Sequence, residues 1–428
     1  MRSVRFAQGP LLLGSLLLGS LLGSCGGTSS DVPAGGGGAG GGATVSSSGS
    51  GETATTAGSS SALESLLAAL DVDRDAALLA QSRDEGWPAP VEGGYLFVTT
   101  DLTQASLAGA FNGWTPVPMT ARDDFAWLVV AAAPGDGYKF TDGGTEFVAD
   151  AWSRGYGHDD HGVMSFVKPS TGPHLERHFE VGGNGLAART LRVLVPAAQA
   201  QRILYVHDGQ NLFDPDAIAG GWRLQETVPA DTMVVGVDNT PARMDEYTHV
   251  PDDLGSGPIG GKADDYADFL HGPVRALIQA TYGEPAVVGV MGSSLGGLAS
   301  LHVADRHPGE YRFAASLSGT LGWGSIGPAI HQATMVERLV AHGHRDTVLY
   351  LDSGGGGPCA DTDSDGIEDD GDGSDNYCET KQLEQALLGV GYTSGVDLHH
   401  WHEPGAPHNE AAWAARVFRP FAVFAKLP

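Results

Sequence analysis

The sequence predicts a mostly parallel β-sheet with helices on both faces, preceded by a small domain of antiparallel strands. After residue 188, apolar runs with the length and composition of buried strands alternate with helical stretches, as at 202–206 and 313–317. Between residues 93 and 168, short strand-like runs are separated by turn-forming pairs such as Asn112-Gly113. The first pattern is typical of α/β proteins, and the second is typical of β-sandwiches.

A sharp turn with a serine at its centre lies in the alternating region. The apolar run 286–291 leads into Gly292-Ser293-Ser294-Leu295-Gly296, and a helical stretch follows. Small residues let the strand and the helix approach closely, and the strained turn projects the Ser294 hydroxyl. Leu295 opens the helix, so its backbone N–H can stabilise an oxyanion beside that hydroxyl. The strand, turn and helix together predict a nucleophilic serine, whereas the pentapeptide alone is weak evidence in a chain with 63 glycines.

Composition limits the kinds of partner that the chain can bind. Its 428 residues are enough for two or three domains, and they carry a net charge of −28. Such an acidic surface repels nucleic acid and anionic lipid headgroups, so we expect neither as a partner. The three cysteines are too few for the disulfide framework of a small secreted protein.

Residues 1–24 have the pattern of a targeting segment. Arg2 and Arg5 precede the apolar run 11–22, which is too short for a comfortable membrane span and ends in Gly23-Ser24-Cys25. This ending resembles the bacterial lipobox, which implies a lipid anchor on Cys25 and a cell-envelope lipoprotein facing the periplasm or the cell surface. The alternative is an ordinary cleaved secretory signal with an incidental cysteine. Both interpretations place the protein outside the cytoplasm.

A linker and a helical segment follow. Residues 25–60 are mostly Gly, Ser, Thr and Ala, so they cannot bury a core and we expect a flexible tether. In the segment 61–83, Ser61 and Glu64 form the pattern of a capping box, and leucines follow at helical spacing. We predict a short helix that packs against a later domain.

Aromatic residues and turns recur in a fixed order between residues 87 and 168. Phe111-Asn112-Gly113-Trp114 is followed by Gly137-Tyr138-Lys139-Phe140 and then by a turn at Asp142-Gly143. This order resembles the family 48 carbohydrate-binding (glycogen-binding, early-set) domain, an immunoglobulin-like β-sandwich. The resemblance implies that Trp114 and Lys139 face a glycan. The second aromatic residue of the family is at best Phe147, and its closing asparagine is not evident, so the domain is expected either to bind glycan or to brace the next domain.

The rest of the chain, residues 172–428, carries a second resemblance. His207-Asp208-Gly209-Gln210, Gly236-Val237-Asp238-Asn239, the serine turn and Pro407-His408-Asn409-Glu410 occur in that order. Together they resemble the putative-esterase branch of the α/β-hydrolases, which includes enterochelin esterases, feruloyl esterases, S-formylglutathione hydrolase and mycolyltransferases. The resemblance implies an α/β-hydrolase fold and hydrolysis of a carboxylic ester. The substrates expected are an acylated or feruloylated carbohydrate or a siderophore ester.

A serine hydroxyl needs a base and a pair of oxyanion donors. His408 is the expected base, because the family keeps its histidine on the loop after the last strand. By resemblance, the backbone N–H of Gln210 joins that of Leu295 in the oxyanion hole. Asp208 is interpreted as a turn-forming residue without a direct chemical role.

The acid that orients the histidine has two candidates, because the loop after the strand 347–351 is enlarged into an acidic insertion, 354–378. Asp375 lies just before the next helix, as the acid does in many relatives, and is preferred. Asp352 closes the strand directly and is the alternative.

The insertion itself has the spacing of a calcium loop. Residues with oxygen ligands would alternate along the insertion, and a glycine would form its sharp turn. The alternative interpretation is an acidic loop that is solvated and binds no metal. Cys359 and Cys378 bracket the loop and would pair in an oxidising compartment. Catalysis by the triad needs no cofactor, so calcium would be structural. The expected ligands are Asp361, Asp363, Asp365, Ile367 (through its carbonyl), Asp369 and Asp372.

Three rival functions follow from the same features. The chain could be a non-catalytic surface lipoprotein that binds carbohydrate through Trp114 and Lys139, although intact Ser294 and His408 argue against this. It could also be an acyltransferase that uses the same triad. A metallohydrolase is the weakest alternative, since no histidine pair has ligand spacing. The expected partners are an ester substrate, which is linked to a glycan if the β-sandwich binds carbohydrate, and a membrane. The membrane would be reached only through a lipid anchor at Cys25.

Overall fold

The computed structural model describes residues 61–428 except 101, 103, 144–145, 169–171, 284, 329 and 372. The predicted signal peptide, Cys25 and the predicted linker 25–60 lie outside the described residues. Within the described ranges, no helix combines the length and the apolar character needed to cross a membrane.

Two helices begin the described chain, α2 (Ala62–Val72) and α3 (Arg74–Asp84). The Ser61 side chain accepts a hydrogen bond from the Glu64 N–H, and the Glu64 side chain accepts one from the Ser61 N–H, so the predicted capping box forms. Leu70 and Leu78 are buried against Trp87, whose Nε1 donates to the Leu78 carbonyl at 3.0 Å. The helices therefore pack onto the first β-layer.

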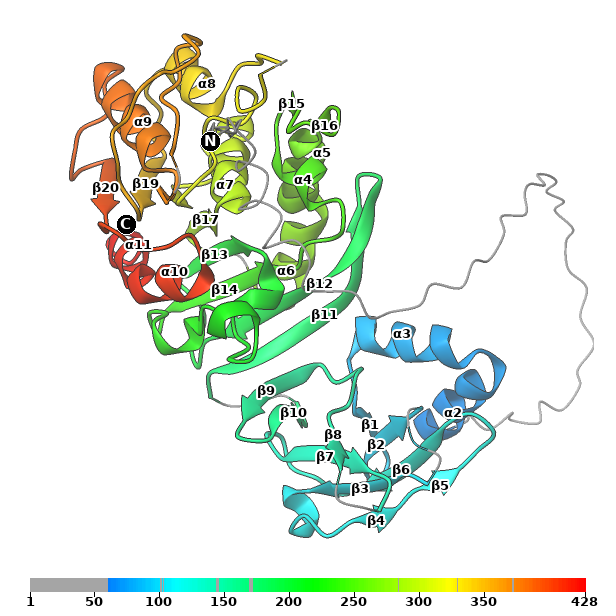
Figure 1. Ribbon diagram of the computed structural model, residues 1–428. Coiled ribbons are helices and arrows are strands. Elements are labelled where there is room, and N and C mark those ends of the chain that lie inside the picture. The colour runs from blue at the N-terminus through cyan, green and yellow to red at the C-terminus, as the bar shows by residue number, and fades with distance from the viewer. Residues whose placement is uncertain are drawn as a thin grey trace, which may run out of the picture.

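The strands that follow form two layers (Figure 1). One sheet has the order β1-β2-β6-β5. Between the layers, Phe97 packs edge-on against Tyr138, with ring centroids 4.8 Å apart, and Leu107 and Phe140 complete a buried core. The first layer comprises β1 (Ala89–Val91), β2 (Gly94–Thr99), β5 (Thr120–Ala121) and β6 (Ala126–Val130). The second comprises β3 (Ser106–Gly109), β4 (Val117–Pro118), β7 (Gly137–Thr141), β8 (Phe147–Val148), β9 (Gly155–Asp159) and β10 (Gly162–Phe166), with the 3-10 turn η1 (Ala110–Asn112) after β3.

The second half is built on a mixed sheet with the order β20-β19-β18-β17-β13-β14-β12-β11. From β14 to β20 neighbouring strands are parallel, whereas β12 pairs antiparallel with β11 and β14. Its strands are β11 (His174–Gly183), β12 (Leu186–Val195), β13 (Arg202–His207), β14 (Thr232–Val237), β17 (Val287–Ser293), β18 (Phe313–Leu317), β19 (Val348–Ser353) and β20 (Leu398–His402).

Both faces of this sheet are buried. On β13, Ile203 and Tyr205 belong to one core cluster, whereas Leu204 and Val206 belong to the other. Helices that cover the first face are α4 (Arg243–Tyr247), α5 (Ala263–Phe269), α6 (Arg275–Tyr282), α7 (Leu295–Arg306), α8 (Met335–His342) and α9 (Tyr377–Gly389). The second face is covered by α10 (Glu410–Arg416), α11 (Phe418–Phe424) and the short turn η4 (Leu224–Glu226). Two further 3-10 turns, η2 (Gly209–Asn211) and η3 (Ile218–Gly220), lie between β13 and η4. A small hairpin, β15 (Pro251–Asp252) and β16 (Ile259–Gly260), precedes α5.

The helical region that joins α5 to α6 is irregular in its middle. Its middle, Leu270–Val274, is a π-helical stretch between α5 and α6, and Pro273 lies inside it. Because proline has no N–H to donate, the regular ladder cannot continue through this turn and the backbone widens.

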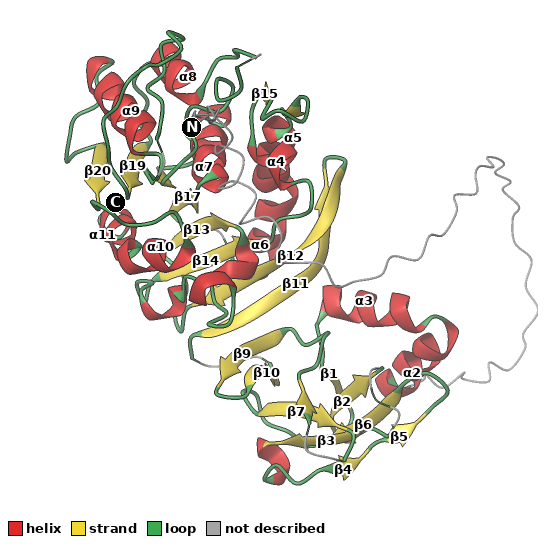
Figure 2. Cartoon of the chain, in the orientation of Figure 1, coloured by secondary structure: helices red, strands yellow, loops and turns green. Residues whose placement is uncertain are grey.

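The two halves share one continuous sheet of 14 strands (Figure 2). Strand β9 pairs antiparallel with β11, which places Tyr156 opposite Leu175 and Gly155 opposite Glu176. Side chains reinforce the joint, since Arg177 Nη2 donates to the Asp150 carbonyl at 2.7 Å. The ladder thus joins strands from both of the predicted domains, 87–168 and 172–428.

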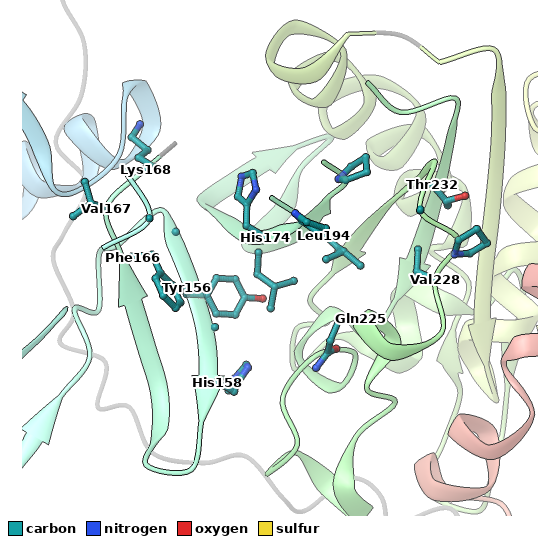
Figure 3. Close-up of a pocket in the computed structure, with 18 residues that line it drawn as sticks. Tyr156, His158, Phe166, Val167, Lys168, His174, Leu194, Gln225, Val228 and Thr232 are labelled. Carbon is teal, nitrogen blue, oxygen red and sulfur yellow. The ribbon is translucent and has the colours of Figure 1, made fainter. Parts of the chain in front are cut away.

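A cavity of about 580 Å³ lies beside this joint (Figure 3). It is lined from the β-layers by Tyr156 and Lys168 and from the second half by Gln225 and Thr232. Burial, together with the nearby Arg154 charge, lowers the pKa of Lys168 to about 8. Because Thr232 begins β14, the cavity lies at the amino end of that parallel strand, opposite the carboxyl edge where Ser294 follows β17.

Buried histidines should make the fold sensitive to acid. Burial lowers the pKa of His207 to about 4, of His302 to about 4 and of His178 to about 3. In the unfolded chain each imidazole binds a proton below about pH 6.5, whereas in the folded chain it stays neutral until about pH 4. The unfolded state therefore binds more protons in this window, and stability is lost as the pH falls through it. Urea unfolding at several pH values should show this loss, and His302→Gln should make the dependence shallower; an unchanged slope would contradict the assignment.

Candidate active site

Ser294 lies at the tight junction between β17 and α7. Its backbone has φ 56° and ψ −127°, a strained conformation for a residue with a side chain. The junction is held because the Ser294 N–H donates to the Leu317 carbonyl at 2.9 Å. A Cβ on Gly292 would lie 2.6 Å from the backbone of Gly296, so only glycine allows this approach. The backbone geometry matches the strained turn that the sequence predicted.

The loop after β13 approaches the same edge. Asp208 has φ 59°, and its carboxylate accepts two hydrogen bonds from Arg243, at 2.8 and 2.9 Å, and one from Asn239. Burial by itself would raise the pKa of Asp208, but Arg243 holds it below its ordinary value. Among the described residues, the backbone N–H of Gln210, like that of Leu295, donates to no other protein group.

His207 is a buried support that the sequence analysis did not single out. Its ring would lie 2.9 Å from a Cβ on Gly292, and its Nδ1 is 2.8 Å from the Tyr266 hydroxyl. The imidazole therefore fills the space directly behind the serine turn. The glycines at 292 and 296 were the available signal, because a backbone that needs glycine has a neighbour at close range.

His408 lies between β20 and α10, where Asn409 caps the helix by accepting from the Ala412 N–H at 3.0 Å. The Nδ1 of His408 is 2.6 Å from Asp375 Oδ1. The Asp375 side chain is 1% exposed, whereas the His408 side chain is 24% exposed. An imidazole that is held at Nδ1 and still reaches solvent can exchange a proton at Nε2.

Asp352 contacts different groups. Its Oδ1 accepts from Arg416 Nε at 3.0 Å, and its Oδ2 accepts from the Tyr350 hydroxyl at 3.1 Å. Burial raises the pKa of Asp352 to about 6, although Arg416 opposes the rise. Of the two candidate acids, the structure therefore brings Asp375, and not Asp352, to His408.

The carboxyl edge of the parallel sheet collects these groups. Ser318 follows β18, and its N–H donates to the Asp352 carbonyl at 2.7 Å, while its hydroxyl donates to Asp375 Oδ2 at 2.7 Å. Within the described part of the chain, no hydrogen bond joins the Ser294 hydroxyl to His408. Such a bond is often long before substrate binds.

Residues 188–422, more than half of the chain, match the protein family described as Putative esterase. The chain belongs to this family. It is therefore a carboxylic ester hydrolase. A search of curated proteins found no match to its sequence.

Solved structures align with the esterase at low sequence identity. The enterobactin esterase FES from Shigella flexneri, crystallised with 2,3-di-hydroxy-N-benzoyl-glycine, has 13% identity and a TM-score of 0.44 over 77% of this chain and 92% of its own. An IroE-like serine hydrolase from Shewanella oneidensis has 17% identity and a TM-score of 0.45 over 59% of this chain and 80% of its own. The siderophore hydrolase EstB from Aspergillus nidulans has 18% identity and a TM-score of 0.40 over 58% and 94%, respectively.

The acidic insertion of the esterase gathers some of the predicted calcium ligands. Carboxylate oxygens of Asp361, Asp363 and Asp369 lie within 4.8 Å of one another. Asp365 instead contacts the Ser325 hydroxyl, and Ile367 is buried in the core. Asp372 lies outside the described residues. The donor set suits calcium, and the calcium site stays a prediction.

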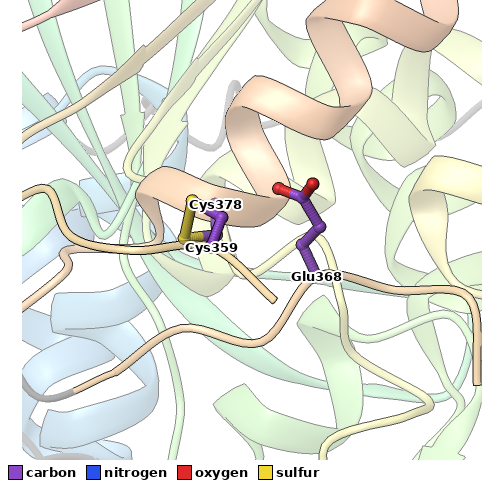
Figure 4. A group of neighbouring side chains, drawn as sticks. All are labelled: Cys359, Glu368 and Cys378. Carbon is purple, nitrogen blue, oxygen red and sulfur yellow. A yellow bond between two sulfur atoms is a disulfide. The ribbon is translucent and has the colours of Figure 1, made fainter. Parts of the chain in front are cut away.

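Cys359 and Cys378 form a disulfide that closes the base of the insertion (Figure 4). Glu368 lies nearby, but sulfurs bonded to each other cannot serve with it as metal ligands. Cys378 lies in the first turn of α9, three residues after Asp375. The crosslink therefore anchors the segment that carries Asp375.

The predicted glycan-facing residues differ in exposure. Trp114 is 40% exposed and Phe147 is 39% exposed. The Lys139 side chain is only 4% exposed, so its expected position on the surface is wrong. The reason is that the β9–β10 turn covers it, where Nζ donates to the His161 carbonyl at 3.1 Å and lies 3.6 Å from Asp159.

Proposed function

We propose that the esterase hydrolyses its ester through a Ser294–His408–Asp375 triad. The observation that carries the proposal is the 2.6 Å contact between His408 Nδ1 and the buried Asp375 carboxylate, at the same sheet edge as the strained Ser294. A carboxylate on Nδ1 fixes the tautomer that leaves Nε2 free to accept a proton.

The reaction would proceed in two halves. Nε2 of His408 accepts the Ser294 hydroxyl proton while Oγ bonds to the ester carbonyl carbon, and the carbonyl oxygen becomes an oxyanion. The free N–H groups of Leu295 and Gln210 stabilise that oxyanion. The alkoxide leaves with the proton from His408, and the acyl-enzyme forms. A water then gives a proton to His408 and attacks the acyl carbon. The bond from that carbon to Ser294 Oγ breaks as His408 returns the proton to Oγ, which releases the carboxylic acid and restores Ser294.

The substrate class that we propose is an acylated or feruloylated carbohydrate, or a siderophore ester. Turnover of an acetylated xylan oligosaccharide, methyl ferulate and a catecholate siderophore ester distinguishes these substrate classes. Transfer of the acyl group to a sugar or lipid, in place of water, is the variant that product analysis would reveal.

Hydrolysis of short-chain p-nitrophenyl esters tests the triad. We expect turnover by the full chain and covalent labelling of Ser294 by a fluorophosphonate, identified by peptide mass. Labelling at another serine, or none with full turnover, would overturn the proposal.

A binding role for residues 87–168 is the second candidate function. The observation that favours it is exposed Trp114, since an indole face stacks on the apolar face of a sugar. Glycan retention by a Ser294→Ala variant, lost in Trp114→Ala, would support it. The burial of Lys139 favours the other role, in which residues 87–168 brace the esterase domain. The family 48 resemblance, the lipid anchor at Cys25 and the location in the cell envelope stay predictions.

We also propose that the insertion binds a structural calcium ion through Asp361, Asp363 and Asp369. Calcium at about 100 times its Kd should stabilise the fold by about 2.7 kcal/mol. Thermal unfolding with calcium and with chelator measures this difference. Asp361→Asn combined with Asp363→Asn should abolish the response, and a parent chain without any calcium response would indicate a solvated loop.

A further inference from the structure

We propose that Arg416 and Ser318 are positioning residues that hold the Asp375 carboxylate, with Asp352 as the counter-ion of Arg416. This inference rests on the proposed function of Asp375 as the acid of the triad. It gives a role to a buried arginine and to the second candidate acid, neither of which touches the reacting atoms.

The Ser318 hydroxyl forms three hydrogen bonds with neighbouring side chains, two as acceptor and one as donor. It accepts from Arg416 Nη2 at 2.6 Å and from Trp413 Nε1 at 3.0 Å. A hydroxyl has two acceptor positions and one proton. Because both acceptor positions are occupied, the proton is directed to Asp375 Oδ2, which is 2.7 Å away.

Asp375 needs such support because no strand holds it. It lies in the long insertion between β19 and α9, and its backbone is left-handed, with φ 53°. Besides Ser318, its Oδ2 accepts from the Gly354 N–H, and Arg416 Nη2 lies 3.4 Å away. The carboxylate is thus oriented by side chains from α10 and the β18 loop, so that Oδ1 remains directed to His408.

Helix α10 links the base to the acid. His408 lies two residues before its first residue, and Trp413 packs edge-on against the imidazole at 5.0 Å between ring centroids. Arg416 follows Trp413 by three residues, so both lie on the same helix face and reach the same Ser318 hydroxyl. Any shift of this helix would therefore displace the base and the acid together.

Asp352 makes the buried arginine tolerable. Arg416 is 2% exposed and Asp352 is 0% exposed, and their contact at Nε is 3.0 Å. A buried charge without a partner is strongly unfavourable, whereas removing both members of a buried pair is often tolerated. Arg416 also donates to the Ala412 carbonyl, so the guanidinium is fixed from both sides.

The test compares Ser318→Ala, Arg416→Lys and the double variant Asp352→Asn/Arg416→Met in the full chain. The double variant removes both buried charges, which protects folding. Arg338→Met is the matched control, because Arg338 likewise binds a buried aspartate, Asp305, at the far end of α7. The readouts are kcat and KM for a p-nitrophenyl ester and the downfield NMR signal of the His408 Nδ1 proton, identified by its absence in His408→Gln.

We expect Ser318→Ala and the double variant to lower kcat about 100-fold, because a small misplacement of the acid has an effect of this size. KM should change little, the Nδ1 signal should move upfield or vanish, and Arg416→Lys should recover part of both. The inference would be overturned if the double variant folds and both it and Ser318→Ala keep the kcat and the Nδ1 proton signal of the parent. The NMR signal is read without substrate, so it decides the role of Arg416 even if Ser294→Ala shows that the proposed chemistry is wrong.

Discussion

Replacing Ser294 by alanine is expected to lower kcat for ester hydrolysis by about 10⁴-fold or more. The reason is that the attacking oxygen is removed while the rest of the site stays in place. Alanine keeps the Cβ, so the turn between β17 and α7 should form as before. The measurement is the steady-state hydrolysis of p-nitrophenyl esters by the parent and the variant, with the folded fraction checked by thermal unfolding.

Ser293→Ala is the matched control for this experiment. Ser293 is the neighbouring serine, is 5% exposed and belongs to β17, where it pairs with Leu317 of β18. Its replacement should leave kcat within about threefold of the parent, since its hydroxyl is neither the proposed attacking oxygen nor a hydrogen-bond partner of His408 or Asp375 among the described residues. Equal turnover by Ser294→Ala and the parent would show that another group attacks the ester.

Replacing Asp375 by asparagine is expected to lower kcat by about 10⁴-fold. An amide has the shape of the carboxylate but can present a donor to Nδ1, which favours the wrong imidazole tautomer. It also removes the negative charge that stabilises the imidazolium formed during attack. The same assay measures the loss, and KM should change much less than kcat because the side chain does not touch substrate.

Asp352→Asn separates the two candidate acids. This residue is bonded to Arg416 and Tyr350. Asparagine keeps an oxygen that can accept from the arginine, so we expect a loss of no more than about tenfold. A larger loss in Asp352→Asn than in Asp375→Asn would reverse the assignment of the acid.

The serine turn was predictable because its causes are local. A β-branched run, small residues at 292, 296 and 297 and an immediate helix fix the geometry within about a dozen positions. The resemblance then supplied His408, which follows the last strand at a short and regular distance. Buried strands such as β13, β17 and β18 were predicted for a similar reason, since burial on two faces leaves continuous apolar runs.

The sequence left two candidate acids, because a long insertion can bring either carboxylate to the histidine. Asp352 and Asp375 are separated by 23 positions in sequence, yet Arg416 contacts both. The choice between them depends on where a crosslinked loop closes and on which partners surround each carboxylate.

The burial of Lys139 and the joint between β9 and β11 were also hidden from the sequence. Lys139 occurs in a motif that resembles a glycan-binding strand, but the β9–β10 turn covers it. The sequence thus determined the strands, the serine turn and the residue types that could form a triad, because periodicity and backbone sterics act between near neighbours. Only the tertiary structure decided which distant side chains meet, since such contacts depend on loop closure and packing across the whole sheet.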